Sequence, residues 1–189
     1  MNKPRIIAAH AGCGKSYFCE TNSNAIDFII MPFKYSNFYE LVSAKEGKEN
    51  LKASDELDFI YNWQDAYYEA LLDTYNTYTD EIIVIPAEKE TLNRLYNDGI
   101  PYLLVYPRED LKEEYRQRYI QRGDSENFLY IFIDCWDSWM RILKKFEGCQ
   151  RIELQEGQYL SDVVDGSTYG KESIIKNKEE YIYNTYFNK

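Results

Sequence analysis

Short apolar runs alternate along this chain with longer segments in which apolar residues recur every three or four positions. The short runs predict five β-strands, at about residues 5–9, 25–30, 81–85, 102–106 and 151–154. Continuous apolar strands separated by helices are typical of a buried parallel sheet with right-handed crossovers. We therefore expect an α/β fold, a three-layer doubly wound sheet of about five parallel strands with helices on both faces.

The longer segments predict helices, because their apolar residues fall on one helical face. A stripe that includes Leu57, Trp63 and Leu71 predicts a long helix, and a stripe from Phe128 to Phe146 predicts a helix that ends at Gly148. The expected helices cover about residues 14–21, 54–78, 87–97, 128–148 and 171–187. The last either packs on its own domain or swaps into a partner subunit, which would make a homodimer.

Composition limits the classes of protein that this chain can represent. With 189 residues, of which 44% are hydrophobic, it is long enough for one α/β domain and short for two. A formal net charge of -10 argues against general nucleic-acid binding, which needs a basic surface. No stretch approaches the ~20 apolar residues of a membrane span, and the cysteines show no metal-ligand spacing. We expect a cytoplasmic protein with no nucleic-acid or membrane partner.

The segment after the first predicted strand carries the clearest chemical signal. Residues 8–16 read AAHAGCGKS, which is a phosphate-binding loop with Ala9 in place of the first glycine. Backbone amides at the start of a helix favour a phosphate group. The motif then predicts that Lys15 reaches the β- and γ-phosphates of ATP and that Ser16 ligates Mg²⁺. The expected phosphate-binding residues are Ala11, Gly12, Cys13, Gly14, Lys15 and Ser16.

The third predicted strand lacks the acid that usually steadies the magnesium ion of such proteins. No carboxylate stands at its C-terminal end, because Asp80 and Glu81 lie at the N-terminal end instead. Glu88, two residues past Pro86, and Asp27, from the second strand, are the candidate substitutes. The apolar Ile29 and Ile30 occupy the expected end of the second strand, where a polar substrate contact would be usual. Reduced or altered activity is therefore an open alternative.

A second informative segment follows the fourth predicted strand, where Arg108 precedes a helix with three more arginines. Arg118 and Arg122 lie four residues apart on one helical face, whereas Arg116 points elsewhere and suits a surface ion pair. Guanidinium groups bind phosphate oxygens well. A helix that carries them could close over the loop as a lid and exclude water during phosphoryl transfer. An ordinary solvated helix is the alternative for this segment.

Together these segments resemble small phage-type P-loop nucleotide kinases, which are related to the nucleoside monophosphate kinases. The resemblance covers about residues 4–165 and rests on three segments: the loop, Asp27 with MPFKYSN at 31–37, and YPRxxLKxEYxxRYxxRG at 106–123. It implies a kinase domain over 1–165, an acceptor-binding insertion at about 33–78, an arginine lid at about 108–123 and a C-terminal helix over 166–189. It also implies a phage-encoded protein of the host cytoplasm.

The resemblance gives each candidate residue a role. Lys15 would hold the donor phosphates, and Arg108, Arg118 and Arg122 would offset charge during transfer. Asp27, Lys34 and Tyr35 would face the acceptor. We expect ATP-dependent phosphoryl transfer to a nucleotide or nucleoside, with Mg²⁺. The alternative is a catalytically slow ATP-binding regulatory protein on the same fold, and a motor or switch NTPase is disfavoured because no sensor motif follows the loop.

Overall fold

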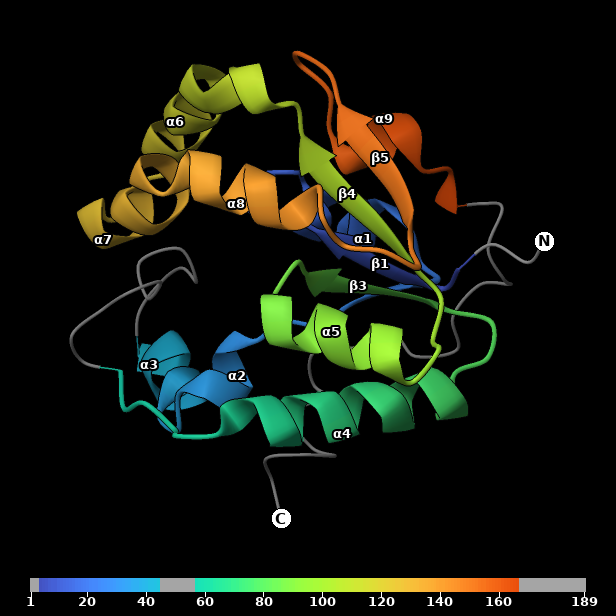
Figure 1. Cartoon of the computed structure of the whole chain (residues 1–189). Helices are drawn as coiled ribbons and strands as arrows, with labels where there is room; N and C mark the ends of the chain where they lie inside the picture. The colour runs from blue at the N-terminus through green and yellow to red at the C-terminus, as the bar shows by residue number, and fades with distance from the viewer. Residues whose placement is uncertain (1–3, 45–56, 167–189) are drawn as a thin grey trace.

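The apolar runs of the sequence form one sheet of five strands, in which every pairing is parallel (Figure 1). In the computed structural model, which describes residues 4–44 and 57–166, the strand order is β2-β3-β1-β4-β5. The strands are β1 (Ile6–Ala9), β2 (Ala25–Asp27), β3 (Ile82–Pro86), β4 (Tyr102–Pro107) and β5 (Gln150–Leu154). β1 lies at the centre, and all four of its residues are buried. The predicted α/β fold with a five-stranded parallel sheet is confirmed.

Helices cover both faces of this sheet, an arrangement compatible with the expected three layers. Helices α5 and α8 lie in front of the sheet in Figure 1, with α4 against α5, while α1 lies behind it beside α9. None of the helices in the described ranges is long and apolar enough to cross a membrane. The helical elements are α1 (Lys15–Thr21), α2 (Met31–Lys34), α3 (Phe38–Ala44), α4 (Trp63–Thr77), α5 (Lys89–Asn97), η2 (Glu109–Leu111), α6 (Lys112–Gln121), α7 (Glu126–Leu129), η3 (Tyr130–Asp134), α8 (Trp136–Leu143) and α9 (Leu160–Val163).

The second strand is shorter than predicted, and its true end changes the chemistry at that edge. β2 stops at Asp27 rather than at Ile30. The carbonyl oxygen of Phe28 accepts a hydrogen bond from the hydroxyl of Tyr67 at 2.9 Å, and α2 starts at Met31, with Pro32 in its first turn. A carboxylate, and not an apolar pair, therefore stands at the C-terminal end of this strand.

The long helix predicted from residue 54 begins only at Trp63. Residues 54–56 lie outside the described ranges. Residues 58–60 pair instead with the segment after α2, because Phe59 forms an antiparallel bridge with Tyr35 and the amide of Ile60 donates to the carbonyl of Lys34 at 2.9 Å. Asn62, at φ 61°, then turns the chain into α4. The predicted helix over 171–187 also lies outside the described ranges.

The helix predicted over 128–148 is interrupted by a wide π-helical turn, η3, between α7 and α8. The amide of Cys135 bonds to the carbonyl of Tyr130, five residues earlier, at 3.3 Å. The carbonyl of Ile131 accepts instead from the indole of Trp139 at 2.8 Å. An apolar stripe alone does not reveal such a turn, because the buried residues on either side keep a spacing close to helical.

Candidate functional site

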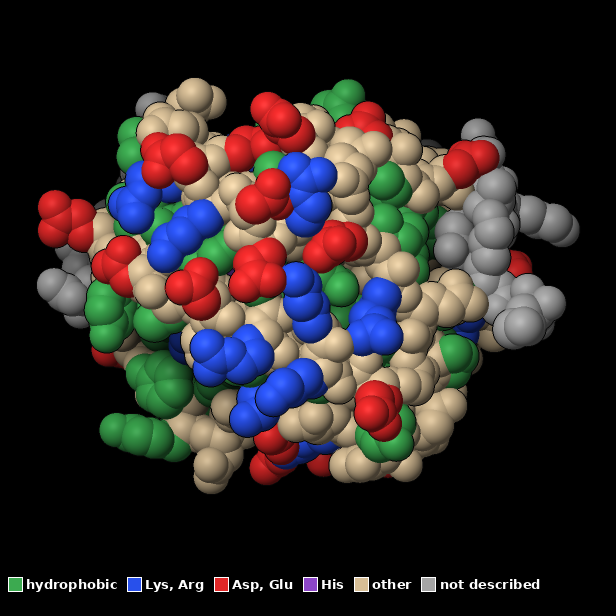
Figure 2. Space-filling model, turned by 45° about the horizontal axis from the view of Figure 1, so that its top comes forward, with side chains coloured by type: hydrophobic (Ala, Val, Ile, Leu, Met, Phe, Trp, Pro, Cys, Tyr) green, Lys and Arg blue, Asp and Glu red, His purple; other side chains and the backbone are tan. Residues whose placement is uncertain are grey.

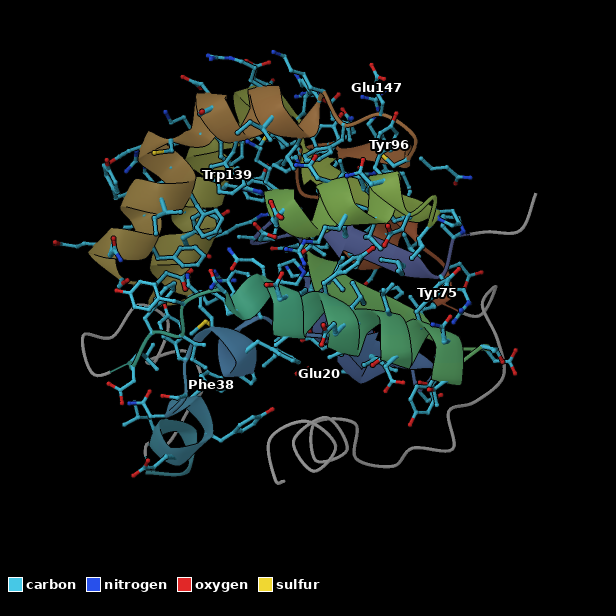
Figure 3. The ribbon with its side chains drawn as sticks, turned by 60° about the horizontal axis from the view of Figure 1, so that its bottom comes forward. Glu20, Phe38, Tyr75, Tyr96, Trp139 and Glu147 are labelled. Carbon is cyan, nitrogen blue, oxygen red and sulfur yellow. The ribbon has the colours of Figure 1, made fainter. Side chains whose placement is uncertain are left out.

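The candidate site is the loop that leaves β1 and enters α1, at the carboxyl edge of the sheet. In Figure 1 the arrowheads of β3 and β4 point toward this edge, which α2 and α3 flank on one side and α6 and α7 on the other. Figure 3 shows Phe38 of α3 and Trp139 of α8 on these two flanks. Ligands of open parallel sheets bind at this edge. The position of the loop therefore suits a binding site.

Two glycines give the loop its shape. Gly12 has φ +76° and Gly14 has φ +84°, a region that L-residues with side chains rarely adopt. A Cβ atom on Gly12 would also lie 2.7 Å from a ring carbon of Tyr119. Ala9, by contrast, is the last residue of β1 and lies in ordinary strand conformation. This conformation does not require glycine, so alanine is compatible with the position at which the motif has its first glycine.

Three consecutive carbonyl groups of the loop receive hydrogen bonds from outside it. The hydroxyl of Tyr119 donates to the carbonyl of Ala11 at 2.9 Å, a guanidinium N–H of Arg118 to that of Gly12 at 3.1 Å, and the amide of Leu160 to that of Cys13 at 2.8 Å. Within a trans peptide the C=O and the following N–H point in opposite directions. The amides that follow these carbonyls therefore point away from α6 and α9.

The amides of Gly12 and Gly14 donate no hydrogen bond within the part of the chain that the structure describes. The amide of Cys13, between them, donates to the carbonyl of His10 at 3.4 Å. Backbone N–H groups without acceptors in a glycine-rich turn favour an anion. Lys15 adds a positive charge there, since its ammonium group donates to the carbonyls of Ala9 and His10, each at 3.0 Å. The loop thus combines oriented amides with a cation, as binding of a phosphate group requires.

The structure brings together two of the three residues that the sequence proposes for magnesium, Ser16 and Asp27. The hydroxyl of Ser16 donates to a carboxylate oxygen of Asp27 at 2.9 Å, across the gap between α1 and the end of β2. Glu88 has a different role, because its carboxylate caps α5 by accepting from the amides of Glu90 and Thr91 at 3.0 and 2.8 Å. Among the described residues, no group of three or more His, Cys, Asp or Glu side chains is arranged around a common metal position.

The arginines after β4 do not converge in this structure. Arg118 pairs with Glu114 of the same helix, and its guanidinium lies between the rings of Tyr115 and Tyr159, with a side chain only 11% exposed. Arg122 pairs with Asp124. The α6 segment is therefore not an open lid in this structure, because Tyr115 and Tyr119 pack it against the loop.

The two remaining arginines, Arg108 and Arg116, are more exposed than Arg118 and Arg122. Arg108, directly after β4, bonds to Asp110 and to Gln155, and Arg116 contacts Glu113 and Asp134, as expected for a surface ion pair. Figure 2, which looks onto the α6 side, shows acidic and basic side chains mixed over the upper part of this face and several basic side chains close together below its centre.

The proposed acceptor residues lie on two different elements. Asp27 is the last residue of β2, whereas Lys34 is the last residue of α2 and Tyr35 follows it. The ammonium of Lys34 lies 5.3 Å from the ring centre of Tyr35 and 5.9 Å from that of Phe59. Phe59 is 48% exposed. This group therefore presents an exposed aromatic surface with a cation above it, in the segment where the resemblance predicts acceptor binding.

His10 is a residue of the loop that the sequence analysis did not single out. Its side chain is buried among the rings of Tyr115, Phe132, Trp136 and Trp139, and its Nε2 atom makes no hydrogen bond within the described ranges. Burial, with a smaller contribution from the charge of Lys15, lowers the pKa of His10 to about 3. The loop is thus anchored to the η3–α8 aromatic cluster by a neutral imidazole.

We expect this imidazole to make the fold less stable in mild acid. Between the ordinary pKa of 6.5 and the folded pKa of about 3, the unfolded chain binds a proton that the folded chain does not, so stability falls as pH falls. From pH 7 to pH 5 the loss is about 2 kcal/mol for this group. Urea unfolding of wild type and His10→Phe at both pH values measures it. An equal loss of stability in the variant would show that His10 is not the group responsible.

Comparisons of this chain with protein-family models, with curated proteins and with solved structures find no match. What the site does must therefore be inferred from its own residues. Those residues are the loop at 9–16, the carboxylate of Asp27, and the two α6 residues that donate to carbonyls of the loop, Arg118 and Tyr119.

Proposed function

We propose that this chain is a P-loop phosphotransferase that binds ATP with Mg²⁺ and transfers the γ-phosphoryl group to a nucleotide or nucleoside. The observation that supports this most strongly is the loop itself. The carbonyls of residues 11–13 accept hydrogen bonds from three groups outside the loop. The amides of Gly12 and Gly14 have no acceptor among the described residues. Together with the Gly-Lys-Ser sequence, this geometry favours a polyphosphate over a single small anion.

The residues at the end of β2 fit a magnesium ion of the kind that accompanies ATP. Mg²⁺ prefers hard oxygen ligands and usually keeps several waters, using one or two protein groups plus the phosphates. The hydroxyl of Ser16 and the carboxylate of Asp27 lie 2.9 Å apart beside the loop and provide such oxygens. When bound, the ion would offset charge on the phosphates. Asp27 then supplies the carboxylate that is missing after β3, and Glu88 serves as a helix cap.

A phosphoryl acceptor needs a second binding region at the same edge of the sheet. Residues 34–36 and 58–60 form a small paired unit there, next to α2, with the exposed ring of Phe59, the half-buried ring of Tyr35 and the charge of Lys34. Aromatic faces suit a planar base and an ammonium group suits a phosphate. These features support an acceptor that carries both groups, such as a nucleoside monophosphate.

One observation favours the alternative, an ATP-binding protein with little turnover. Arg108, Arg118 and Arg122 each contact a carboxylate, so the guanidinium charge expected at the transferred phosphoryl is already neutralised. An arginine can be worth several orders of magnitude in the rate of phosphoryl transfer. The two functions are separated by mixing the protein with ATP, Mg²⁺ and a panel of nucleosides and nucleoside monophosphates. A phosphorylated acceptor supports the kinase, bound ATP without turnover supports the alternative, and absence of ATP binding overturns both.

Lys15→Met tests the loop assignment. We expect the variant to lose at least tenfold in affinity for MgATP, because a charge-assisted contact to phosphate contributes more than about 1.4 kcal/mol. The matched control is Lys89→Met, which removes the charge of an exposed lysine at the start of α5. Titration calorimetry measures both. Equal affinities in the two variants would remove Lys15 from the site.

Asp27→Asn and Glu88→Gln test which carboxylate serves the metal. We expect Asp27→Asn to raise the Mg²⁺ concentration needed for half-maximal ATP binding or turnover by about tenfold, since an amide loses the charge that favours the ion. Glu88→Gln should leave that concentration unchanged and lower stability by about 1 kcal/mol through the weakened helix cap. The reverse pattern would assign the metal to Glu88.

A further inference from the structure

We infer that α6 sets the shape of the phosphate loop, with Tyr119 and Arg118 as positioning residues for the backbone on either side of Gly12. The inference deepens the proposed function and rests on it for the identity of the ligand. It differs from the lid role expected for this helix. Two consecutive residues of α6 donate to two consecutive carbonyls of the loop, Tyr119 to Ala11 and Arg118 to Gly12.

The two carbonyls belong to the two peptide planes that flank Gly12. Glycine imposes the weakest restriction on φ and ψ, so these planes are the ones in the loop most able to rotate. Rotation of the first plane would turn the amide of Gly12 away from a bound phosphate and put the carbonyl of Ala11 in its place. The hydroxyl of Tyr119, 2.9 Å from that carbonyl in a buried position, holds the plane in the orientation that suits an anion.

Arg118 is itself held in place on every side. Its guanidinium donates to the carbonyls of Gly12 and Gln158, at 3.1 and 3.0 Å, and pairs with Glu114. The ring centres of Tyr115 and Tyr159 lie 4.6 and 3.9 Å from it. The guanidinium of Arg118 therefore connects the loop to Gln158 and Glu114. It could contact a phosphate directly only if these hydrogen bonds broke.

The same network connects α6 with the segment after β5. The carboxylate of Glu114 accepts from the amide of Gly157 at 3.1 Å, and the amide of Leu160, three residues later, donates to the carbonyl of Cys13. The peptide plane before Gly14 is therefore held by a segment that α6 itself contacts. Since the planes on both sides of Gly12 and before Gly14 are held by groups outside the loop, the affinity of the loop for a polyphosphate depends on α6.

The chain offers a matched pair of variants for this inference. Tyr115 and Tyr119 lie one turn apart on α6 and are both fully buried, but the hydroxyl of Tyr115 contacts the thiol of Cys13 and not a backbone carbonyl. Tyr119→Phe removes the hydroxyl bond to the loop backbone, whereas Tyr115→Phe removes a hydroxyl of equal burial that leaves the backbone untouched. Inorganic tripolyphosphate with Mg²⁺ is the probe, because it reports on the loop without a base or sugar, and MgATP is the second ligand.

We expect Tyr119→Phe to weaken binding of both ligands by about five- to tenfold, the usual contribution of one buried hydrogen bond, and Tyr115→Phe to change it by less than twofold. In the ligand-free protein, ¹⁵N relaxation dispersion at Gly12 should appear in Tyr119→Phe and be absent from wild type and Tyr115→Phe. Arg118→Lys keeps the positive charge and loses the planar set of N–H donors of the guanidinium. We expect it to weaken binding of both ligands as Tyr119→Phe does.

The outcomes separate this inference from the proposed function. If wild type binds the probes and both tyrosine variants match it, or if both weaken equally, the positioning role is overturned while the function stands. If dispersion at Gly12 follows the loss of the Tyr119 hydroxyl but wild type binds neither probe, α6 does hold the loop, and the assignment of the loop to polyphosphates is wrong.

Discussion

The direction of the peptide planes between Ala11 and Gly14 is the constraint on which the rest of the site depends. A loop can bind an anion through its amides only if its carbonyls have donors elsewhere, because a carbonyl oxygen facing a phosphate repels it. Here the donors come from α6 and from the segment after β5. The glycines at 12 and 14 permit the required backbone conformation, but the surrounding elements determine it. The sheet contributes by placing β1, from which the loop emerges, between β3 and β4.

This constraint explains the role of some of the tyrosines, which are unusually frequent in this chain, with 19 in 189 residues. Several described tyrosines, among them Tyr35, Tyr61 and Tyr67, pack with other rings, and amphipathic packing accounts for them. At the loop, two tyrosines of one helix combine a buried ring with a hydroxyl, so that a single side chain both excludes water and satisfies a polar group. Leucine or phenylalanine at position 119 would fill the space and leave the carbonyl of Ala11 without that donor.

The sequence was sufficient for the sheet and the loop, since both depend on local pattern. Apolar runs located all five strands, and the Gly-Lys-Ser motif located the residues whose geometry favours an anion. The sequence was not sufficient where contacts with a distant segment determine the local structure. The bridge between Tyr35 and Phe59 delays the start of α4, and the hydroxyl of Tyr67 takes the carbonyl that would have extended β2. Helical spacing placed Arg118 and Arg122 on one face, yet could not show that Glu114 and Asp124 would hold them apart.

The three arginines differ in how firmly their acids hold them, and this difference bears on how charge could be offset during transfer. Asp124, the partner of Arg122, has a fully buried side chain, and Arg118 is 11% exposed with several acceptors. Removing the guanidinium of Arg122 would leave the buried carboxylate of Asp124 unpaired, which is costly. Removing that of Arg118 would leave the carbonyls of Gly12 and Gln158 without this donor. Arg108 and its partner Asp110 are both exposed, at 40% and 66%, so water screens that pair and can replace each partner. Arg108 also follows β4 directly, at the edge of the sheet where the loop lies. If an arginine of this chain turns toward a transferred phosphoryl group, Arg108 is the one whose release costs least.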